Sequence, residues 1–431
     1  MWSLAVLATC RPAPVILLFL SLSFAYVDAM STELAPFWFL TRGGPNTDGA
    51  WATTTDEAGN VYLGDHETVP GPWSDDYVYK FTPEGQELWK TRWGGPWNEQ
   101  AFILAVHGDR LYMGGRTDKQ LPLTSGDIAV VAFDIHDGRK IWDFTWDQGY
   151  GYEEVDGLVV DGGFIYVAGW TTGQNTQNDL AVLKLDLNGQ IVWSNTWGTP
   201  SWDEANGQIV VDSQNVYVAG RYNAQNMLSG GDAVLVAFDK STGAYKWHKI
   251  WGGAAMDDAL GMVGDLPYLY VVGMTSSFGQ GIQIFLNKYD VNGSILWSKI
   301  WGGTGGDISR TLTIGRNHRV FVGGKTDSYG KGQNDVLLLK YDQDGNLEFY
   351  KTWGSSGVDE THAIVAYEDF IYIAGETTSY GAGKQDSLLL KVDANGENII
   401  PEFANTSMMI VVALTVVYVL IRRKNMTSSF S

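Results

Sequence analysis

The sequence predicts an all-β fold: a seven-bladed β-propeller of four-stranded blades, with its ring closed by the N-terminal strand. Three observations predict it. A pattern built on Trp-Gly recurs every 50 to 54 residues. Each of the first six copies holds four short strand-like segments, whereas the last copy lacks the fourth. Four strands per repeat of about 40–50 residues is typical of propeller blades, which bury both faces only when they pack radially.

Each repeat unit presents the same motifs in the same order. Trp-Gly or its equivalent opens the unit, an acidic residue follows, and then come a segment of the Tyr-Val-Ala-Gly type and a final segment holding a Trp. The units start near residues 42, 93, 146, 197, 251, 301 and 353. Phe37-Trp-Phe-Leu-Thr41 matches the missing final segment, so the predicted propeller spans residues 36–399.

The repeat resembles the SBBP β-propeller repeat family. Unit five carries its hallmarks in order: Trp251-Gly-Gly, Asp257-Asp-Ala259, Tyr270-Val-Val-Gly273, Lys288-Tyr-Asp-Val-Asn-Gly293 and Trp297. The resemblance implies the propeller fold and an association with surface or secreted proteins. It implies no particular activity, because a fold alone does not specify a function.

Composition agrees with a folded, strand-rich protein. The chain of 431 residues contains 52 Gly and 18 Trp, and 45% of its residues are hydrophobic, which excludes a disordered chain. Its single cysteine, Cys10, excludes a disulfide scaffold.

The two ends of the chain carry apolar segments outside the repeats. Residues 1–29 resemble a signal peptide, with one basic residue before an apolar run. After a linker at 400–407, residues 408–421 predict a transmembrane helix, and the basic tail 422–431 would be cytoplasmic. Pro401-Glu-Phe403 with this helix and tail resembles an archaeal PEF-type sorting signal, which implies that a lipid anchor replaces the helix. We therefore expect a single-pass or lipid-anchored cell-membrane protein with an extracellular propeller.

The charge of the chain excludes nucleic acid as a partner. The net charge is −20, and residues 30–403 hold 25 of the 29 basic and 48 of the 49 acidic residues, a net −23. Nucleic-acid binding needs Lys and Arg to neutralise phosphate. Asn292 and Asn405 are glycosylation candidates on the exported side.

The repeated acids predict a structural role. They follow the Trp position by six residues, where a short acid can accept hydrogen bonds from the turn backbone; they are Asp48, Glu99, Asp203, Asp257, Asp307 and Asp359. A cation such as calcium held by this ring of acids is the alternative. The six His residues share no repeat position and no ligand spacing, so no metal site is expected.

Candidate ligand-binding residues lie where the repeats differ. Loops after the Trp position of units two to four carry aromatic residues, and the residue after the second-strand Gly is aromatic or Arg in the same units. The set is Trp97, Arg116, Tyr150, Tyr152, Trp170, Trp202 and Arg221. In an up-and-down blade both positions lie on one face, and exposed aromatic and Arg residues are typical of binding hot spots.

These features favour a non-enzymatic surface propeller that binds a ligand, a glycan or a partner protein through blades two to four, without a cofactor. A structural surface-layer or adhesion component that uses acids and cations is one alternative. A quinone-dependent or glycan-cleaving enzyme is another, because residues 238–247 resemble a quinoprotein docking repeat. The chain has neither the eight blades nor the adjacent cysteines of those enzymes, and no nucleophile motif.

Overall fold

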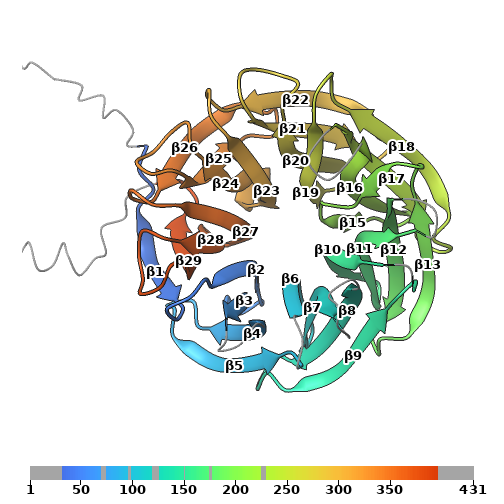
Figure 1. Cartoon of the computed structure of the whole chain (residues 1–431), viewed down its shortest axis with the longest axis horizontal. Helices are drawn as coiled ribbons and strands as arrows, with labels where there is room; N and C mark the ends of the chain where they lie inside the picture. Colours follow the sequence, from blue (N-terminus) through green and yellow to red (C-terminus); the bar gives the residue numbers. More distant parts are fainter. Residues whose placement is uncertain are drawn as a thin grey trace, which may run out of the picture. The chain divides into compact units, whose positions relative to one another are not determined.

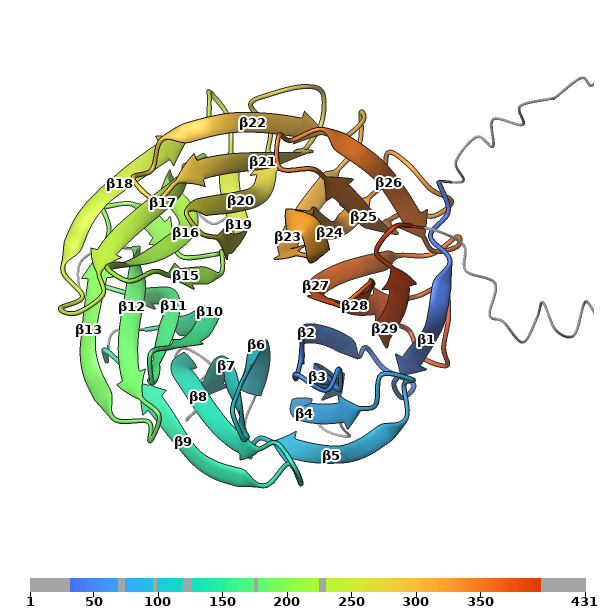
Figure 2. The same cartoon turned by 180° about the vertical axis from the view of Figure 1, so that it is seen from behind.

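The computed structural model of the chain describes residues 32–68, 74–95, 99–118, 126–149, 151–173, 177–224 and 230–396. These residues form seven antiparallel sheets set around one axis, each running from an innermost to an outermost strand (Figures 1 and 2). The predicted all-β, seven-bladed propeller is therefore confirmed.

The first three blades are continuous in sequence, and each adds its strands from the centre outwards. Blade one contains β2 (Gly49–Thr55), β3 (Val61–Thr68), β4 (Ser74–Phe81) and β5 (Glu87–Trp93); blade two contains β6 (Glu99–His107), β7 (Arg110–Asp118), β8 (Gly126–Asp134) and β9 (Lys140–Trp146); blade three contains β10 (Glu153–Asp161), β11 (Phe164–Thr172), β12 (Asn178–Asp186) and β13 (Ile191–Trp197).

Blade four differs from its neighbours because its innermost strand is interrupted. Both β14 (Trp202–Glu204) and β15 (Ile209–Val211) pair with β16 (Asn215–Ala224), which is followed by β17 (Asp232–Asp239) and β18 (Tyr245–Trp251). Blade five contains β19 (Asp257–Asp265), β20 (Tyr268–Thr275), β21 (Gln283–Asp290) and β22 (Ile295–Trp301), and blade six contains β23 (Asp307–Ile314), β24 (Val320–Thr326), β25 (Asp335–Tyr341) and β26 (Leu347–Trp353).

The ring closes through the N-terminal strand, as the sequence predicts. Blade seven contains β27 (Asp359–Tyr367), β28 (Phe370–Thr377) and β29 (Asp386–Asp393), and its outermost strand is β1 (Pro36–Arg42). The two segments pair antiparallel with Trp38 opposite Lys391, although more than 340 residues separate them in the chain. Figure 1 shows β1 beside β29 at the edge of this blade.

A repeated aromatic pair joins the second and fourth strands of the blades. In six blades a buried Tyr of the second strand contacts a Trp of the fourth, with ring centroids 5.9 to 6.3 Å apart: Tyr62–Trp89, Tyr112–Trp142, Tyr166–Trp193, Tyr217–Trp247, Tyr270–Trp297 and Tyr372–Trp38. The indole also reaches the next blade, because Trp89 Nε1 donates to the Ile135 carbonyl at 3.2 Å and Trp142 Nε1 to the Leu187 carbonyl at 3.1 Å. Trp38 and Trp297 make the same kind of bond, so in four blades the repeated Trp links the blade to its neighbour.

Several expectations about the chain ends lie outside the described residues, namely the signal peptide, the helix 408–421 and the glycosylation candidate Asn405. Within the described ranges, no helix has the length and apolar composition that crossing a bilayer requires. Asn292 lies exposed in the turn between β21 and β22, and its glycosylation stays a prediction.

Candidate functional site

The innermost strands position side chains around the axis through β-bulges. In six blades the register between the first and second strands shifts around one residue, and that residue has no partner across the ladder. The bulged residues are Trp51, Phe102, Asp156, Leu260, Arg310 and His362. In blade four the break between β14 and β15 contains Asn206. Bulges re-aim side chains and are common next to functional sites.

In blades two to seven a glycine on the second strand makes the bulge sterically possible, whereas Asp65 stands at the equivalent position in blade one. A Cβ on Gly169 would lie 1.8 Å from the Glu154 carbonyl oxygen, and a Cβ on Gly220 would lie 1.9 Å from that of Glu204. No side chain fits at such a distance. The recurrent Gly that ends the Tyr-Val-Ala-Gly segment is therefore needed for close backbone approach.

The bulges and the second strands together enclose a cavity of about 660 Å³ within blades two to six. Its volume is within the range of small-molecule and cofactor sites. Its lining residues come from the first three strands of these blades: Arg116, Tyr152, Glu154, Asp156, Trp170, Thr172, Asn178, Trp202, Glu204, Asn206, Arg221, Asp258, Leu260, Met274 and Arg310. We call this the central cavity.

The central cavity contains five of the seven binding residues expected from the sequence, namely Arg116, Tyr152, Trp170, Trp202 and Arg221. The other two, Trp97 and Tyr150, lie outside the described residues. The cavity also extends beyond the expected blades, because blade five contributes Asp258, Leu260 and Met274 and blade six contributes Arg310. Ligand binding by these residues stays a prediction.

The aromatic residues line the blade-three and blade-four side of the central cavity. Trp170 is buried, with 8% of its surface exposed, whereas Trp202 and Tyr152 are half-buried. The Arg116 guanidinium lies 5.4 Å from the centre of the Tyr152 ring, within the range of a cation–π contact. The aromatic faces and a cation therefore share one wall.

The cavity also contains a network of buried charges. Arg221 Nη2 donates to Glu204 Oε2 at 2.6 Å, and its Nη1 lies 3.7 Å from Asp258 Oδ2. Arg116 Nη1 donates to Glu154 Oε2 at 2.9 Å. Amides complete the network, because Asn178 Nδ2 donates to Glu204 Oε1 at 2.6 Å and Asn206 Nδ2 to Asp258 Oδ1 at 3.1 Å.

Asp156 is the least compensated acid of the network. Its Oδ2 is buried and accepts no hydrogen bond within the described part of the chain. Burial raises the pKa of Asp156 well above its ordinary value, and the nearby carboxylates raise it further, whereas Arg310 opposes the shift. Burial likewise raises the pKa of Asp258 to about 6. Burial of the Asp156 carboxyl therefore favours its protonated form at the wall of the cavity.

The sequence analysis did not identify the acids of the central cavity or Arg310. Glu154, Glu204 and Asp258 each follow a repeated structural acid, and Asp156 and Arg310 are bulged residues. The sequence does contain a sign of these cavity residues, because the residue type at their positions changes from unit to unit, whereas the neighbouring positions repeat. The repeated acid that precedes each of the three carboxylates is easier to recognise, because it recurs in nearly every unit.

Five of the six repeated acids accept hydrogen bonds from the backbone of the turns that open the repeat units. Asp48 accepts from the Gly44 amide at 2.7 Å, Asp257 from the Gly253 amide at 2.8 Å and Asp307 from the Gly303 amide at 2.7 Å. This arrangement is the one that a structural role requires. The alternative of a cation held by the ring of acids stays untested.

Comparison with known proteins identifies a family and a fold. The family described as outer membrane protein assembly factor BamB matches residues 126–377, which is more than half of the chain. No protein with a curated description matches the sequence.

Solved structures share the architecture at low identity. The WD40 β-propeller domain of Doa1 has a TM-score of 0.51 and 12% identity, over 83% of this chain and 96% of that one. The Pan2 WD40 domain of Neurospora crassa (TM-score 0.49, 12% identity, 80% and 89% covered) and the quinohemoprotein alcohol dehydrogenase of Comamonas testosteroni (0.44, 12%, 86% and 78%) are also similar, but too distantly to support an argument about function.

Proposed function

The chain belongs to the family described as outer membrane protein assembly factor BamB, and from this premise we propose that it is a non-enzymatic binding propeller at the cell surface. Its ligand is a neutral, hydroxyl-rich molecule, a glycan, bound in the central cavity. The description of the family as an assembly factor supports a binding role in general. The observation that carries the choice of ligand is that one cavity combines three aromatic side chains with Asp156, whose Oδ2 accepts no hydrogen bond from the described residues.

The pairing of charges in the central cavity disfavours an anionic ligand. Two of its three guanidinium groups are already engaged, Arg116 by Glu154 and Arg221 by Glu204, and the charge of the third, Arg310, interacts with Asp156 and Asp258. A phosphate or carboxylate would have to displace these carboxylates and would meet the other acids of the lining. Removing one partner from a buried ion pair leaves an uncompensated charge, which costs about 3–5 kcal/mol.

A glycan can contact both the aromatic side chains and the Asp156 carboxyl of the central cavity. The flat faces of Trp170 and Trp202 suit the apolar face of a sugar ring, and the Asp156 carboxyl can exchange hydrogen bonds with its hydroxyls. Ten of the fifteen lining residues are polar or charged, which suits a ligand with many hydroxyl groups. A buried carboxyl without a partner gains most from such a ligand, because leaving it unpaired costs free energy.

Glycan binding by the purified full-length chain in detergent tests the proposal. We expect a specific signal on a glycan array that is lost in the double variant Trp170→Ala, Trp202→Ala. The control is Tyr329→Ala, Tyr380→Ala, which removes two exposed aromatic residues from blades six and seven. Thermal unfolding verifies that both variants are folded. Absence of binding to any glycan, or equal binding by both double variants, would contradict the proposal, and capture of a protein by the cavity would assign it a protein ligand instead.

The surface location is the part of the proposal that rests on sequence alone. Residues 1–29 and 400–431 provide the expected export signal and the expected membrane helix or lipid anchor, and both lie outside the described residues. The resemblance to SBBP repeats supports the same location. Membrane fractionation of the full chain, compared with a chain truncated at residue 403, tests the anchor.

A glycan-cleaving hydrolase is the second candidate, and the raised pKa values favour it. Two-carboxylate glycosidases need one protonated and one ionised acid near the scissile bond. The central cavity offers Asp156 with its raised pKa, and Glu204 beside Arg221. Release of reducing ends from a bound glycan by the wild-type chain, abolished in Asp156→Asn, would establish this activity in place of simple binding.

A further inference from the structure

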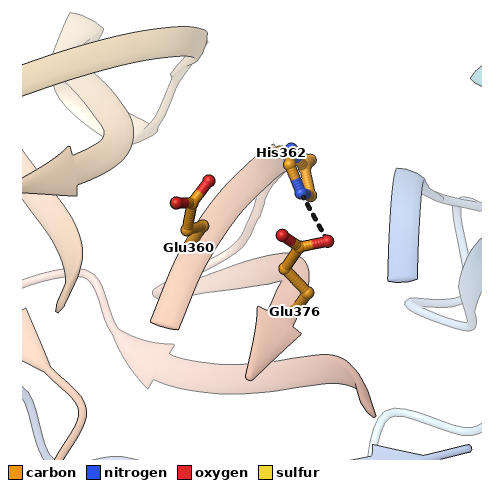
Figure 3. Close-up of side chains that lie close together, drawn as sticks. All are labelled: Glu360, His362 and Glu376. Carbon is orange, nitrogen blue, oxygen red and sulfur yellow. Dashed lines mark ion pairs between the residues drawn. The ribbon is translucent and has the colours of Figure 1, made fainter. Parts of the chain in front are cut away.

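Blade seven holds a second group of potentially ligating side chains, away from the central cavity. Glu360 and His362 lie on the innermost strand β27 and Glu376 on the adjacent strand β28 (Figure 3). One ligand atom from each of the three side chains lies within 4.8 Å of the others. His362 Nε2 is 3.3 Å from Glu376 Oε2, as the dashed line in Figure 3 marks.

The ring nitrogens of His362 have no hydrogen-bond partner among the described residues. Its side chain is 7% exposed, and neither Nδ1 nor Nε2 makes a well-directed hydrogen bond there. The ring stacks on Trp51 of blade one, with centroids 4.0 Å apart and planes at 17°. This stacking fixes the plane of the imidazole, so Nε2 is directed at the carboxylates. A buried imidazole without hydrogen bonds is costly unless something binds it.

The other blades provide an internal comparison at these three positions. The register makes Glu360, His362 and Glu376 equivalent to Glu154, Asp156 and Trp170 in blade three, and to Ile308, Arg310 and Lys325 in blade six. The equivalent residues are Gly49, Trp51 and His66 in blade one; Gln100, Phe102 and Arg116 in blade two; Glu204, Asn206 and Arg221 in blade four; and Asp258, Leu260 and Met274 in blade five. Among these sets, the one in blade seven combines an imidazole with two carboxylates. A set that the fold itself required would recur in every blade, so the fold does not explain this combination.

Neighbouring side chains hold the two carboxylates of this group in place. Glu376 lies beside the His362 imidazole and interacts with Gln385 and with the charge of Lys325. Glu360 accepts from Lys325 Nζ at 2.7 Å and from Asn334 Nδ2 at 3.1 Å. The ammonium of Lys325 thus occupies the position of a counter-cation beside Glu360.

We propose that Glu360, His362 and Glu376 bind a divalent transition-metal ion of the Zn²⁺ class at the inner edge of blade seven. Imidazole suits Zn²⁺ and its neighbours, whereas Ca²⁺ and Mg²⁺ take oxygen ligands only. Three protein ligands that leave a fourth position to water are a known coordination of zinc in proteins. Neither the central cavity nor its ligand enters this inference.

Zinc binding by the metal-stripped full-length chain tests the site. Equilibrium dialysis with elemental analysis should find one Zn²⁺ per wild-type chain, with affinity about a hundredfold weaker in His362→Ala and in Glu376→Gln. The matched control is His318→Ala, which removes an exposed imidazole paired with Asp265. Zinc-free wild type, equal affinity in wild type and His362→Ala, or loss only in His318→Ala would overturn the proposal.

A third variant separates metal binding from a loss of structure. Lys325→Met removes the cation that competes for Glu360, so we expect about tenfold tighter Zn²⁺ binding, a gain that a destabilised protein would not show. Co²⁺ in place of Zn²⁺ should give a visible d–d absorption band that disappears in His362→Ala. Unchanged or weaker binding by folded Lys325→Met, or a Co²⁺ spectrum indifferent to His362, would refute the assignment.

Discussion

Arg221 and Glu204 form an ion pair of 2.6 Å in which both side chains are almost completely buried, with 3% and 5% of their surfaces exposed. They are direct partners across the first and second strands of blade four. The same guanidinium faces Asp258 of blade five at 3.7 Å. A single arginine thus neutralises carboxylates from two adjacent blades at the wall of the central cavity.

Loss of Arg221 should therefore destabilise the propeller strongly. Arg221→Met leaves Glu204 and Asp258 buried without their counter-charge, and we expect a loss of about 3–5 kcal/mol in the free energy of unfolding. The double variant Arg221→Met, Glu204→Gln should recover part of that loss, because it also removes a buried charge. Urea unfolding of the two variants and of Glu204→Gln alone completes a double-mutant cycle. Additive effects in this cycle would show that the pair is not coupled.

The close backbone approach at the bulge of blade seven predicts that one added methyl group on its glycine strongly destabilises the fold. A Cβ on Gly375 would lie 1.9 Å from the Glu360 carbonyl oxygen. Gly375→Ala must open the bulge, so we expect a loss of about 2 kcal/mol or more, together with displacement of the His362 ring. Gly44→Ala is the control, because a Cβ there meets no atom within 4 Å. Equal melting temperatures for the two variants would contradict this account of the recurrent glycine.

Ring closure should depend on the N-terminal strand through Trp38. The indole contacts Tyr372 and donates from Nε1 to the Pro83 carbonyl of blade one at 3.2 Å, so it ties blade seven to blade one. Trp38→Ala should cost about 3 kcal/mol of unfolding free energy, and Trp38→Phe about 1 kcal/mol, because phenylalanine keeps the ring contact and loses the hydrogen bond. Denaturant titrations measure both, and similar losses in the two variants would show that only the hydrogen bond matters.

The fold could be predicted from sequence because every blade repeats the residues that build it. Trp38 is an example, since its place in the repeat pattern predicts strand β1 and the closure of the ring. Trp170 and Arg221 were found in the same way, as variable residues at a defined position after a repeated glycine. Repetition thus identified the scaffold, and departures from it identified part of the candidate site.

Asp156 and His362 could not be located by the same reasoning. Each occupies a bulge, and a bulge depends on the pairing of two strands, which no single segment reveals. The Glu360, His362 and Glu376 group shows the consequence, because its third member comes from another strand and no ligand spacing is visible along the chain. The sequence analysis expected no metal site for that reason.

The raised pKa values of the central cavity predict that stability falls as the pH rises. Unfolded aspartate titrates near pH 4, whereas Asp156 titrates well above its ordinary value in the folded chain and Asp258 near pH 6. Between the two pKa values the folded state holds a proton that the unfolded state has released. The free energy of unfolding therefore decreases from about pH 4 upwards and levels off above the folded-state pKa values.

Asp156→Asn should remove a large part of this dependence, because asparagine has the same shape and no proton to lose. We expect the variant to gain stability over wild type at pH 8 and to differ little from it at about pH 3 and below, where the wild-type carboxyl is largely protonated in both states. Thermal unfolding at several pH values measures the effect, and Asp143→Asn on the exposed surface of β9 is the control. A wild-type slope retained in Asp156→Asn would mean that Asp156 is ionised in the folded protein, and would remove the basis for treating it as the hydroxyl-binding group of the cavity.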